Sequence, residues 1–464
     1  MPRGLIAAIA CGVIALGFVF GASLWVVAGL AGMLTLLGAR TMARTLADAA
    51  IIVRDTNHGG PSNRDSNDVD ADRGAVGDRT VRSGSRVDVA VTVRNRSRLP
   101  MPWVLIEERK PRFVNQSPDV ISPPIETEGD TVAVRLLMPD QTETLRYEVV
   151  CHRRGYVQIG PTTLETGDLL GLFRNYQLAG HPTFVTVLPK VHPIHSYELG
   201  SRRPIGEIRI RERAMEDPTR LRGIRQWQIG DPMRSVHWAA TARTGTLHTK
   251  IYEPSSIIGA TMVIDMHRDT NPPHNEPVRC DLAISAAASM ASALLNQNEP
   301  FGLATNGRDA ADRLRIESLR ANGGTFADRA SAKAQSATES ANDRMRPVVM
   351  RPDKTAAHYH EMLATMARLE RTDGLTLPQL LIECESRLPG DTTLIVLVQM
   401  ADAAAIAALV GLHRRGRAVE VVINTDRDED FGVIAGPLTA EKIGVHHLKS
   451  ESVIPDLCRN LAVR

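Results

Sequence analysis

The chain has 464 residues, 43% of them hydrophobic and 23% charged, which is enough material for two or three folded domains. Its 55 basic and 53 acidic side chains leave a formal net charge of +2, and this excludes the global basic field typical of nucleic-acid-binding proteins. The five cysteines are odd in number and show no Cys-x-x-Cys spacing. The soluble part therefore fits a reducing compartment.

The N-terminal stretch from Gly4 to Gly38 contains no charged residue. As one helix it would rise roughly 50 Å, well beyond a hydrocarbon core of about 30 Å. Small residues at 21–23 divide it into Leu5–Phe20 and Leu24–Leu37, which predicts a transmembrane helical hairpin over residues 1–40. A re-entrant arrangement stays open because both halves are short. A cleaved signal peptide is the alternative, although its apolar core should be about 7–15 residues long.

The charges beside this hairpin predict its orientation. Arg3 precedes it, and Arg40 and Arg44 follow it, while the turn carries no charge. The positive-inside rule then places both outer ends in the cytoplasm. We expect a multi-pass protein of the cell membrane, in contact with membrane lipid, whose soluble part lies in the cytoplasm.

Composition and periodicity divide the soluble part. Residues 41–80 are expected to be a juxtamembrane spacer, because residues 54–82 are rich in Asp, Asn, Arg, Ser and Gly and lack apolar periodicity. Apolar and polar residues then alternate over 87–93, and again in Thr131–Leu137 and Thr144–Val150. This alternation predicts an antiparallel β-sandwich over residues 81–190.

The last part, residues 258–464, has a different period. Short apolar runs such as Thr261–Ile264 alternate with helical patterns such as Leu282–Leu295, and this alternation predicts an α/β domain with a mostly parallel sheet. Residues 321–346 are rich in Ala, Ser, Asn, Asp and Gly and are expected to form a flexible insertion. The predicted fold class is thus multidomain: a transmembrane hairpin, a β-sandwich and a C-terminal α/β domain.

Residues 191–257 join the two soluble domains and carry the most specific motif. The run 221–238 reads LRGIRQWQIGDPMRSVHW and continues through AATAR to Lys250. It closely resembles the signature of domain-of-unknown-function family 58. The upstream runs CHRRGY at 151–156 and GDLLGLF at 167–173 resemble further elements of the same family.

This resemblance implies a membrane-anchored protein whose C-terminal domain is von Willebrand factor A-like, a Rossmann-like fold. It also implies co-operation with a cytoplasmic AAA ATPase of the MoxR group. The expected function is that of a scaffold or adaptor in protein maturation or complex assembly, with an unknown client. The residues that match the interdomain signature are Arg222, Arg225, Gly230, Asp231, Arg234, His237, Trp238, Arg243 and Lys250.

The signature residues allow two interpretations. Gly230-Asp231-Pro232 favours a tight turn whose carboxylate can hold backbone or an arginine fork, and Arg234 and Arg243 can make bidentate bonds. In the favoured interpretation these residues lock the junction between the domains; in the other they form the acid–base cluster of an unrecognised enzyme. The sequence has no phosphate loop, Gly-x-Ser-x-Gly elbow or His-Glu-x-x-His helix, which favours the scaffold over the enzyme and leaves the enzyme as the alternative.

An arginine-rich stretch overlaps the start of the signature. Eight arginines lie between Arg202 and Arg225, mixed with acidic residues. A solvated, salt-bridged face is the favoured interpretation, and a module that binds anionic lipid or an acidic protein surface is the alternative. Nucleic acid is not an expected partner because no aromatic platforms are interleaved with these charges.

A metal site is expected to be degenerate at best. Von Willebrand factor A-like domains that bind a cation carry Asp-x-Ser-x-Ser after their first strand, because one carboxylate and two hydroxyls suit a hard ion. In this chain Asp265 matches, but His267 and Asp269 replace the serines, and imidazole would suit a softer metal. Thr376 matches a second element of such sites. We expect no cofactor, and at most weak binding of a divalent cation through Asp265, Asp269 and Thr376.

Overall fold

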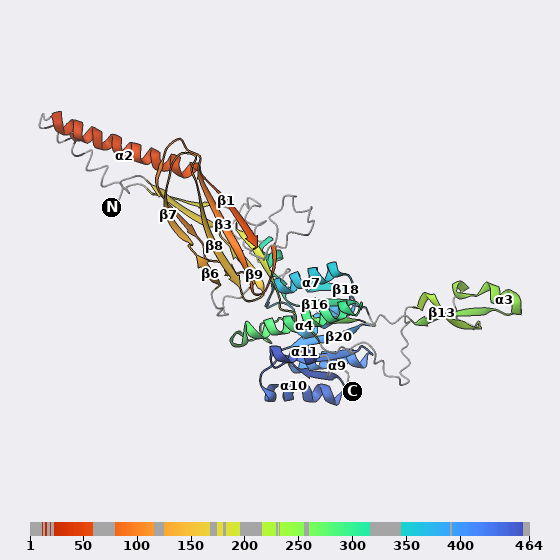
Figure 1. Cartoon of the computed structure of the whole chain (residues 1–464). Helices are drawn as coiled ribbons and strands as arrows, with labels where there is room; N and C mark the ends of the chain where they lie inside the picture. The colour runs from red at the N-terminus through yellow and green to blue at the C-terminus, as the bar shows by residue number, and fades with distance from the viewer. Residues whose placement is uncertain are drawn as a thin grey trace. The chain divides into compact units, whose positions relative to one another are not determined.

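The structure is a computed structural model. It describes residues 23–58, 79–115, 125–167, 174–179, 182–194, 216–228, 231, 233–254, 259–315, 345–389 and 392–457, together with positions 12, 14, 15 and 19. Two compact units divide the chain (Figure 1). The first comprises residues 1–115 and 122–188, and the second comprises residues 116–121 and 189–464.

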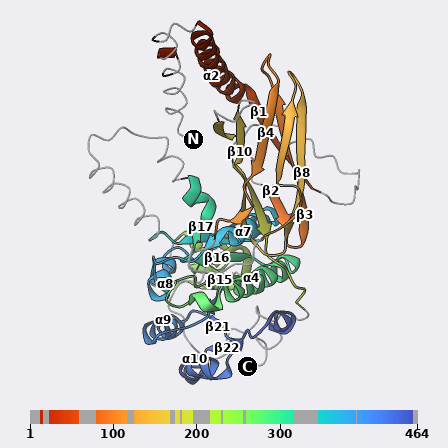
Figure 2. The ribbon, with the colours of Figure 1, turned by 90° about the vertical axis from the view of Figure 1, so that its left-hand side faces the viewer.

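The first unit begins with one long helix, α2 (Ser23–Ala49), which runs without a break into strand β1 (Ala50–His58). Figure 2 shows the two elements in succession. The helix therefore continues past Leu37, where the sequence predicted the end of the second membrane helix. Most of the expected first helix, Leu5–Phe20, lies outside the described residues.

The apolar helices of the described residues give little support to a multi-pass protein. One of them, α4 (Val278–Asn296), is long and apolar enough to cross a membrane, but 61% of its apolar window is buried inside the protein. Its small side chains pack against the sheet of the second unit, as in the core helix of a soluble domain. The apolar part of α2, Val26–Gly38, is shorter than a typical span.

Twelve strands of the first unit form three four-stranded sheets, in the orders β1-β3-β8-β6, β11-β10-β4-β7 and β2-β12-β9-β5. Their neighbours pair antiparallel, except that β12 and β2 are parallel. The remaining bounds are β2 (Arg79–Arg82), β3 (Ser85–Asn95), β4 (Met101–Glu108), β5 (Arg112–Phe113), β6 (Glu126–Gly129), β7 (Val132–Leu137), β8 (Thr142–Cys151), β9 (Gly155–Ile159), β10 (Thr162–Gly167), β11 (Arg174–Ala179) and β12 (Thr183–Leu188).

One hydrophobic core joins the three sheets. In β3 the alternate residues Val87, Val89, Val91 and Val93 are buried, which confirms the strand predicted from their alternation. They pack in one cluster with side chains such as Ile106 from the other sheets. Burial of these residues on one face fixes the register of β3, because a slip by one residue would expose all of them.

The segment expected as a spacer is partly ordered. Residues 41–49 complete α2, and β1 pairs with β3 along its whole length, from Ala50 opposite Asn95 to His58 opposite Val87. The apolar run Ile51-Ile52-Val53 supplies the β-branched residues that this strand needs. The expectation of a spacer over 41–80 is thus wrong for its first half, and residues 59–78 lie outside the described residues.

The second unit contains a six-stranded sheet in the order β18-β16-β15-β20-β21-β22. Its strands pair parallel, except for β18, which is antiparallel to β16. The order departs from β15 in both directions, so the sheet is doubly wound, with its switch point between β15 and β20. The bounds are β15 (Ala260–Ile264), β16 (Phe301–Thr305), β18 (Val348–Asp353), β20 (Thr393–Val398), β21 (Val419–Ile423) and β22 (Gly444–His447).

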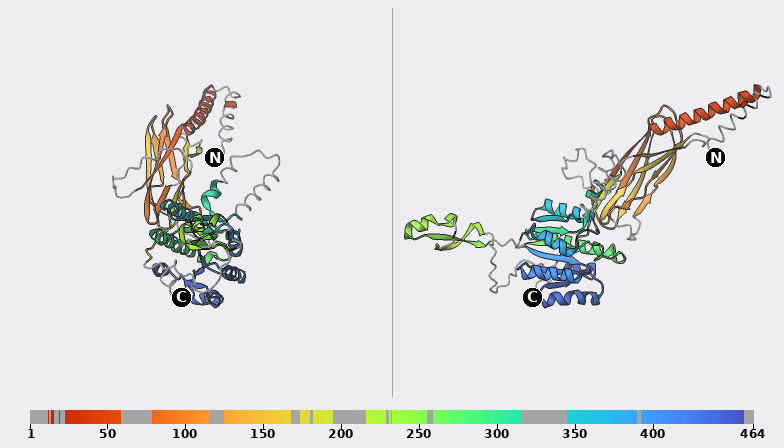
Figure 3. Two further views of the ribbon diagram at one scale, coloured as in Figure 1. Left: turned by 90° about the vertical axis from the view of Figure 1, so that its right-hand side faces the viewer. Right: turned by 180° about the vertical axis from the view of Figure 1, so that it is seen from behind.

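Helices cover both faces of this sheet (Figure 3). On one face Val263 and Val396 of the sheet share a core with Leu380 and Leu409, which belong to α8 (Leu377–Glu385) and α9 (Ala403–Arg414). Helix α10 (Asp428–Ala440) joins them through Leu438. On the other face α4 contacts α7 (Ala356–Arg368). This layering agrees with the expected α/β domain; most of the expected insertion at 321–346 lies outside the described residues.

Candidate functional site

The interdomain signature folds as a small hairpin. Strands β13 (Glu216–Gln226) and β14 (His248–Pro254) pair antiparallel, with Arg225 opposite Thr249. Between them lie a 3₁₀ turn, η1 (Met233–Ser235), and the short helix α3 (Trp238–Thr244). Figure 1 shows α3 at one end of the strand pair. The hairpin brings the residues that follow β13 next to the start of β14.

The carboxylate of Asp231 organises the turn that leaves β13. Its Oδ1 accepts a charge-assisted bond from Nη2 of Arg225 at 2.7 Å, and its Oδ2 accepts from the backbone N–H of Gln228 at 3.0 Å and from the hydroxyl of Thr249 at 3.3 Å. The Arg225 guanidinium and these donors hold the pKa of Asp231 below its ordinary value. The indole N–H of Trp227 adds a bond to the Asp231 carbonyl at 3.2 Å.

His237 caps the helix that follows. Its Nδ1 accepts the backbone N–H of Ala240 at 3.0 Å, and its own N–H donates to the carbonyl of His248 at 2.8 Å. The His237 ring therefore acts as the N-cap of the helix. The residues after His237 form the short helix α3.

The described side chains of the remaining signature residues do not converge on a catalytic cluster. Among the described side chains, Arg225 is the arginine that holds Asp231, whereas Arg243 is exposed on α3 and Lys250 is half-buried on β14. The expected bidentate role of Arg243 finds no support, because the helix places it at the surface. The backbones of Arg222 and Arg234 lie on β13 and η1, whereas their side chains, and the whole of Gly230, lie outside the described residues.

Four apolar side chains of this hairpin are exposed. Trp238 on α3 is 63% exposed and Met233 on η1 is 58% exposed. Ile224 on β13 is 42% exposed, and Leu247, just before β14, is 38% exposed. We call these four residues the hairpin patch.

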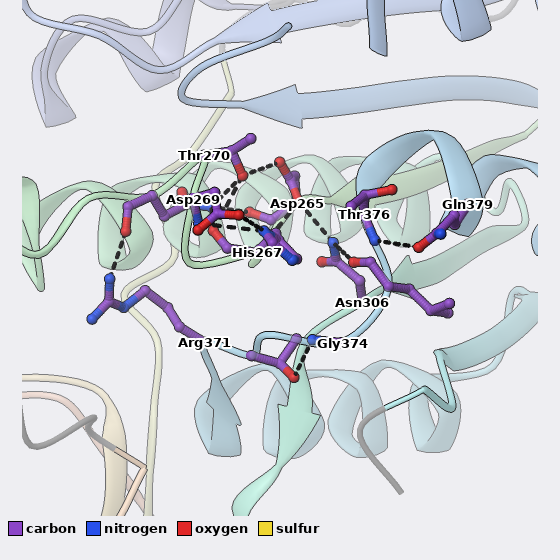
Figure 4. A network of polar contacts seen from close by, with 12 residues as sticks. Asp265, His267, Asp269, Thr270, Asn306, Arg371, Gly374, Thr376 and Gln379 are labelled. Atoms are coloured by element: carbon purple, nitrogen blue, oxygen red, sulfur yellow. Dashed lines mark hydrogen bonds and ion pairs between the residues drawn. The ribbon is translucent and has the colours of Figure 1, made fainter. Parts of the chain in front are cut away.

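A second polar cluster lies at the carboxyl end of the parallel sheet. Asp265 directly follows β15 and is almost fully buried. Its Oδ2 accepts from the hydroxyl of Thr270 at 2.6 Å, and its Oδ1 accepts from the amide of Asn306 at 2.8 Å and from the backbone N–H of His267 at 3.2 Å. Figure 4 shows this network. Burial raises the pKa of Asp265, although all three donors oppose the rise.

Buried amide side chains continue along the same edge. Gln399 follows β20, donates to Oε1 of Glu276 at 3.2 Å and accepts from Asn275 at 2.8 Å. Asn424 follows β21 and donates to the carbonyl of Arg279 at 2.7 Å. Burial raises the pKa of Glu276. The side chains at this edge of the sheet thus satisfy one another's hydrogen-bond donors and acceptors.

This edge does not fit a divalent cation well. Asp269 points away, with 90% of its side chain exposed and its nearest carboxyl oxygen 3.7 Å from Nδ1 of His267. Thr376 is an exposed residue at the start of α8, where its N–H donates to Gln379 at 3.0 Å. Among the described residues no three His, Cys, Asp or Glu side chains gather as a ligand set. The amide of Asn306 and the hydroxyl of Thr270 occupy the lone pairs that a cation would need.

Comparison with known proteins finds one matching family model. A family model described as "Protein of unknown function DUF58" matches residues 223–368. This segment of the chain is thus similar to the DUF58 family. The matched residues include the turn of Asp231, the cap of His237 and the network around Asp265. This match confirms the resemblance drawn from the signature.

A curated relative also matches part of this chain. An uncharacterized protein, YeaD of Bacillus subtilis (strain 168), is 24% identical over 230 residues. The match covers 49% of this chain and 53% of YeaD, so it spans about half the length of that relative.

Similarities to solved structures are weak. A FixG-related protein from Vibrio parahaemolyticus is 8% identical, with 30% of this chain and 97% of that chain covered and a TM-score of 0.17. The ASH/PapD-like domain of human CEP192 is also 8% identical, with coverages of 24% and 82% and a TM-score of 0.19. Similarities this low carry no argument about this chain.

Several residues of these clusters escaped the sequence analysis. Thr270, Asn306, Gln399 and Asn424 were not singled out, yet they form the polar edge of the sheet. A usable signal existed, because Asn306, Gln399 and Asn424 each follow the end of a buried apolar strand by one residue. Carboxyl ends of parallel strands meet at one edge, so polar residues at these positions gather there.

Proposed function

We propose that this protein is a membrane-anchored scaffold or adaptor that works with a cytoplasmic MoxR-type AAA ATPase in protein maturation or complex assembly. One observation carries the proposal. In the signature hairpin the polar residues Asp231 and His237 are used to hold the fold, while the apolar hairpin patch faces solvent. Such an arrangement suits protein binding better than catalysis.

The composition of the hairpin patch favours a protein partner. Clustered exposed apolar side chains on a soluble protein mark interaction surfaces. Tryptophan is among the residues that dominate binding energy, and methionine adapts to varied partners. Asp231 and Arg225 hold the turn that precedes Met233 and α3, so the patch is presented on a pre-organised scaffold, which lowers the entropic cost of binding.

The architecture of the second unit supports the Rossmann-like, von Willebrand factor A-like part of the proposal. Its strand order is doubly wound, and its first central strand, β15, ends at Asp265. In this fold the carboxyl edge at the switch point is the usual ligand position. Since side-chain donors saturate Asp265, we infer that this domain acts as a rigid platform and not through a bound cation.

The N-terminal region supports the membrane anchor. A methyl group added at Gly29 would collide with Cγ1 of Ile14, and it would lie 3.3 Å from the backbone nitrogen of that residue. Close approach of two apolar segments at a glycine is typical of helix packing in membranes. The pair supports a helical hairpin, and Arg40 and Arg44 then keep the soluble part on the cytoplasmic side.

The orientation has a direct test. A single cysteine at Asp65 should stay unlabelled when an impermeant maleimide is added to intact cells, and it should react after lysis. Strong labelling in intact cells would place the soluble part outside and remove a cytoplasmic ATPase from consideration.

The proposed partner has a quantitative test. The full chain in nanodiscs should bind the MoxR-type ATPase of its own organism. Trp238→Ala and Met233→Ala should each weaken binding by about tenfold or more, since central apolar contacts in interfaces are commonly worth 1.4 kcal/mol or more, roughly a factor of ten. Ile382→Ala, which removes an exposed aliphatic side chain from α8, is the matched control and should bind like the wild type. Unchanged binding in both hairpin variants would overturn the proposal.

A further inference from the structure

The first unit has one end that lies next to its N-terminal helix. Helix α2 passes into β1 at Ala50 with no intervening residue, and Ala50 pairs with Asn95, the last residue of β3. The chain therefore leaves the helix at the end of the sandwich where β3 finishes. We call this the anchor end.

Strand pairing brings two further turns to the anchor end. The loop 96–100 follows Asn95 directly, and the turn 138–141 lies beside it because Arg94 pairs with Thr142 and Met101 pairs with Leu137. A backbone bond of 2.8 Å from Asp140 to the carbonyl of Asn95 links the two.

The side chain of Asn95 fixes this arrangement. Asn95 is fully buried, and its amide donates to the carbonyls of Leu99 at 2.9 Å and Leu137 at 3.0 Å. Its Oδ1 accepts the backbone N–H of Ser97 at 2.9 Å. A buried amide that satisfies both turns holds their outer side chains in a defined orientation.

The outer side chains of the anchor end combine cations with apolar groups. Leu99 is 47% exposed, and Leu136 and Met138 are each 52% exposed. The exposed arginines of this end are Arg94, Arg96 and Arg98. We call these six residues the anchor-end patch.

Among the described residues of these two turns, two are acidic, and they have partners of their own. Asp140 forms an ion pair with Arg94 at 3.2 Å, and Glu143 accepts from the amide of Gln141 at 3.3 Å. The described residues of these turns thus carry three arginines against two carboxylates. Positive charge next to exposed aliphatic side chains is the pattern that anionic lipid surfaces attract.

We propose that the anchor-end patch is a lipid-contact surface, which lies on the headgroup region of an anionic bilayer and fixes the sandwich against the membrane. The inference rests on the proposed membrane anchor and goes beyond it. An anchor alone would tether the sandwich, whereas this surface would orient it. Arg96 and Arg98 would meet lipid phosphates, and Leu99 and Met138 would enter the boundary between headgroups and acyl chains.

The opposite end of the same strands provides an internal control. There β3 begins at Ser85, opposite Cys151, and His152 is exposed. Ten residues of extended strand separate Ser85 from Asn95, which amounts to about 33 Å at roughly 3.3 Å per residue. A probe at His152 should therefore stay in water when a probe at Leu99 contacts lipid.

The test uses the full chain in nanodiscs that contain doxyl-labelled lipid near the headgroups. Cys11 and Cys458 are replaced by serine, since Cys151, Cys280 and Cys384 are buried. Bimane is attached to Leu99→Cys or to His152→Cys. Discs with phosphatidylglycerol should quench the Leu99 probe about twofold or more, as expected for a side chain that enters the lipid boundary. They should leave the His152 probe unchanged, and discs of phosphatidylcholine alone should quench the Leu99 probe less.

Charge variants test whether the arginines of the patch cause the preference for anionic lipid. The double variant Arg96→Gln with Arg98→Gln should remove the additional quenching of the Leu99 probe that phosphatidylglycerol causes. The double variant Arg82→Gln with Arg146→Gln, at exposed positions away from the anchor end, should show the same additional quenching as the wild type.

The possible failures are distinct. A chain that separates from the discs during size-exclusion chromatography would overturn the anchor and this inference together. A chain that stays in the discs with an unquenched Leu99 probe would overturn the lipid contact alone. Protection of that probe from aqueous iodide without lipid quenching would show a protein partner or second copy on the patch, and it would also overturn the inference.

Discussion

Replacement of Asp265 tests whether the sheet edge is a self-sufficient polar network. In Asp265→Asn, Oδ1 can still accept from Asn306 and from the backbone of His267, while the new amide can donate to Thr270. The Thr270 hydroxyl can then donate to the His267 carbonyl, which is already 3.1 Å away. We expect this variant to keep the edge folded. Asp265→Ala removes the acceptor for all three donors.

The expected cost of Asp265→Ala follows from the donors that it leaves unpaired. The Thr270 hydroxyl keeps the His267 carbonyl as acceptor, but the Asn306 amide and the His267 N–H lose theirs. At about 1.5 kcal/mol for each buried donor, the local loss is about 3 kcal/mol. At 1.4 kcal/mol for each factor of ten, hydrogen exchange of the amides around β15 should speed up by roughly 100-fold. Asp265→Asn should change it by less than about tenfold. Mass-spectrometric exchange on peptides over 260–271 of the full chain measures both.

The pH dependence adds an independent signature. Burial raises the pKa of Asp265 above its ordinary value of 3.8. A carboxyl group with a raised folded pKa contributes stability that is present below its unfolded pKa and is lost as the pH rises toward its folded pKa. Exchange in wild-type peptides should therefore accelerate from about pH 4 upward after correction for intrinsic rates, and Asp265→Asn should remove that component.

One outcome would refute this reasoning. If millimolar magnesium slowed exchange at 260–271 in the wild type and had no effect in Asp265→Asn, Asp265 would be a cation ligand. The network would then be a metal site, in spite of the hydrogen bonds that saturate it.

Three further predictions concern other parts of the chain. Arg225→Ala should raise the pKa of Asp231, so the turn should open at a higher pH than in the wild type as the pH falls. Arg225→Lys should restore the low pKa only in part. NMR titration of the Asp231 carboxyl measures both pKa changes. The Cys151 and Cys384 thiols, whose pKa burial raises to about 11, should resist maleimide at pH 8 until the protein unfolds. Phe301→Ala, at a fully buried position that contacts Tyr359, should destabilise the second unit by about 3–5 kcal/mol in urea unfolding.

Local sequence patterns predicted which helices and strands form better than they predicted the residues at which those elements begin and end. The alternation over 87–93 predicted β3 because one face of that strand must be buried. The end of α2 was missed because the absence of charge after Gly4 marks an apolar segment and not a helix boundary. Arg40 and Arg44 are good helix formers outside lipid, so the helix continues to Ala49.

The partners of site residues were harder to predict. The signature offers four arginines around Asp231, and the choice among them depends on the pairing of β13 with β14. That register places Arg225 opposite Thr249, so both reach the same carboxylate. Since no local pattern encodes this pairing, the sequence indicated a polar turn but not the arginine that holds it.

The central claim is that the signature hairpin binds the ATPase. Photo-crosslinking in intact membranes tests it most directly, with a benzophenone amino acid in place of Trp238 and, as the matched control, in place of the exposed Ile382 of α8. We predict that Trp238 gives a covalent adduct with the MoxR-type ATPase, identified by mass spectrometry, and that Ile382 does not. Equal adducts at both positions, or none at Trp238 when the two proteins are shown to be present together, would contradict the account.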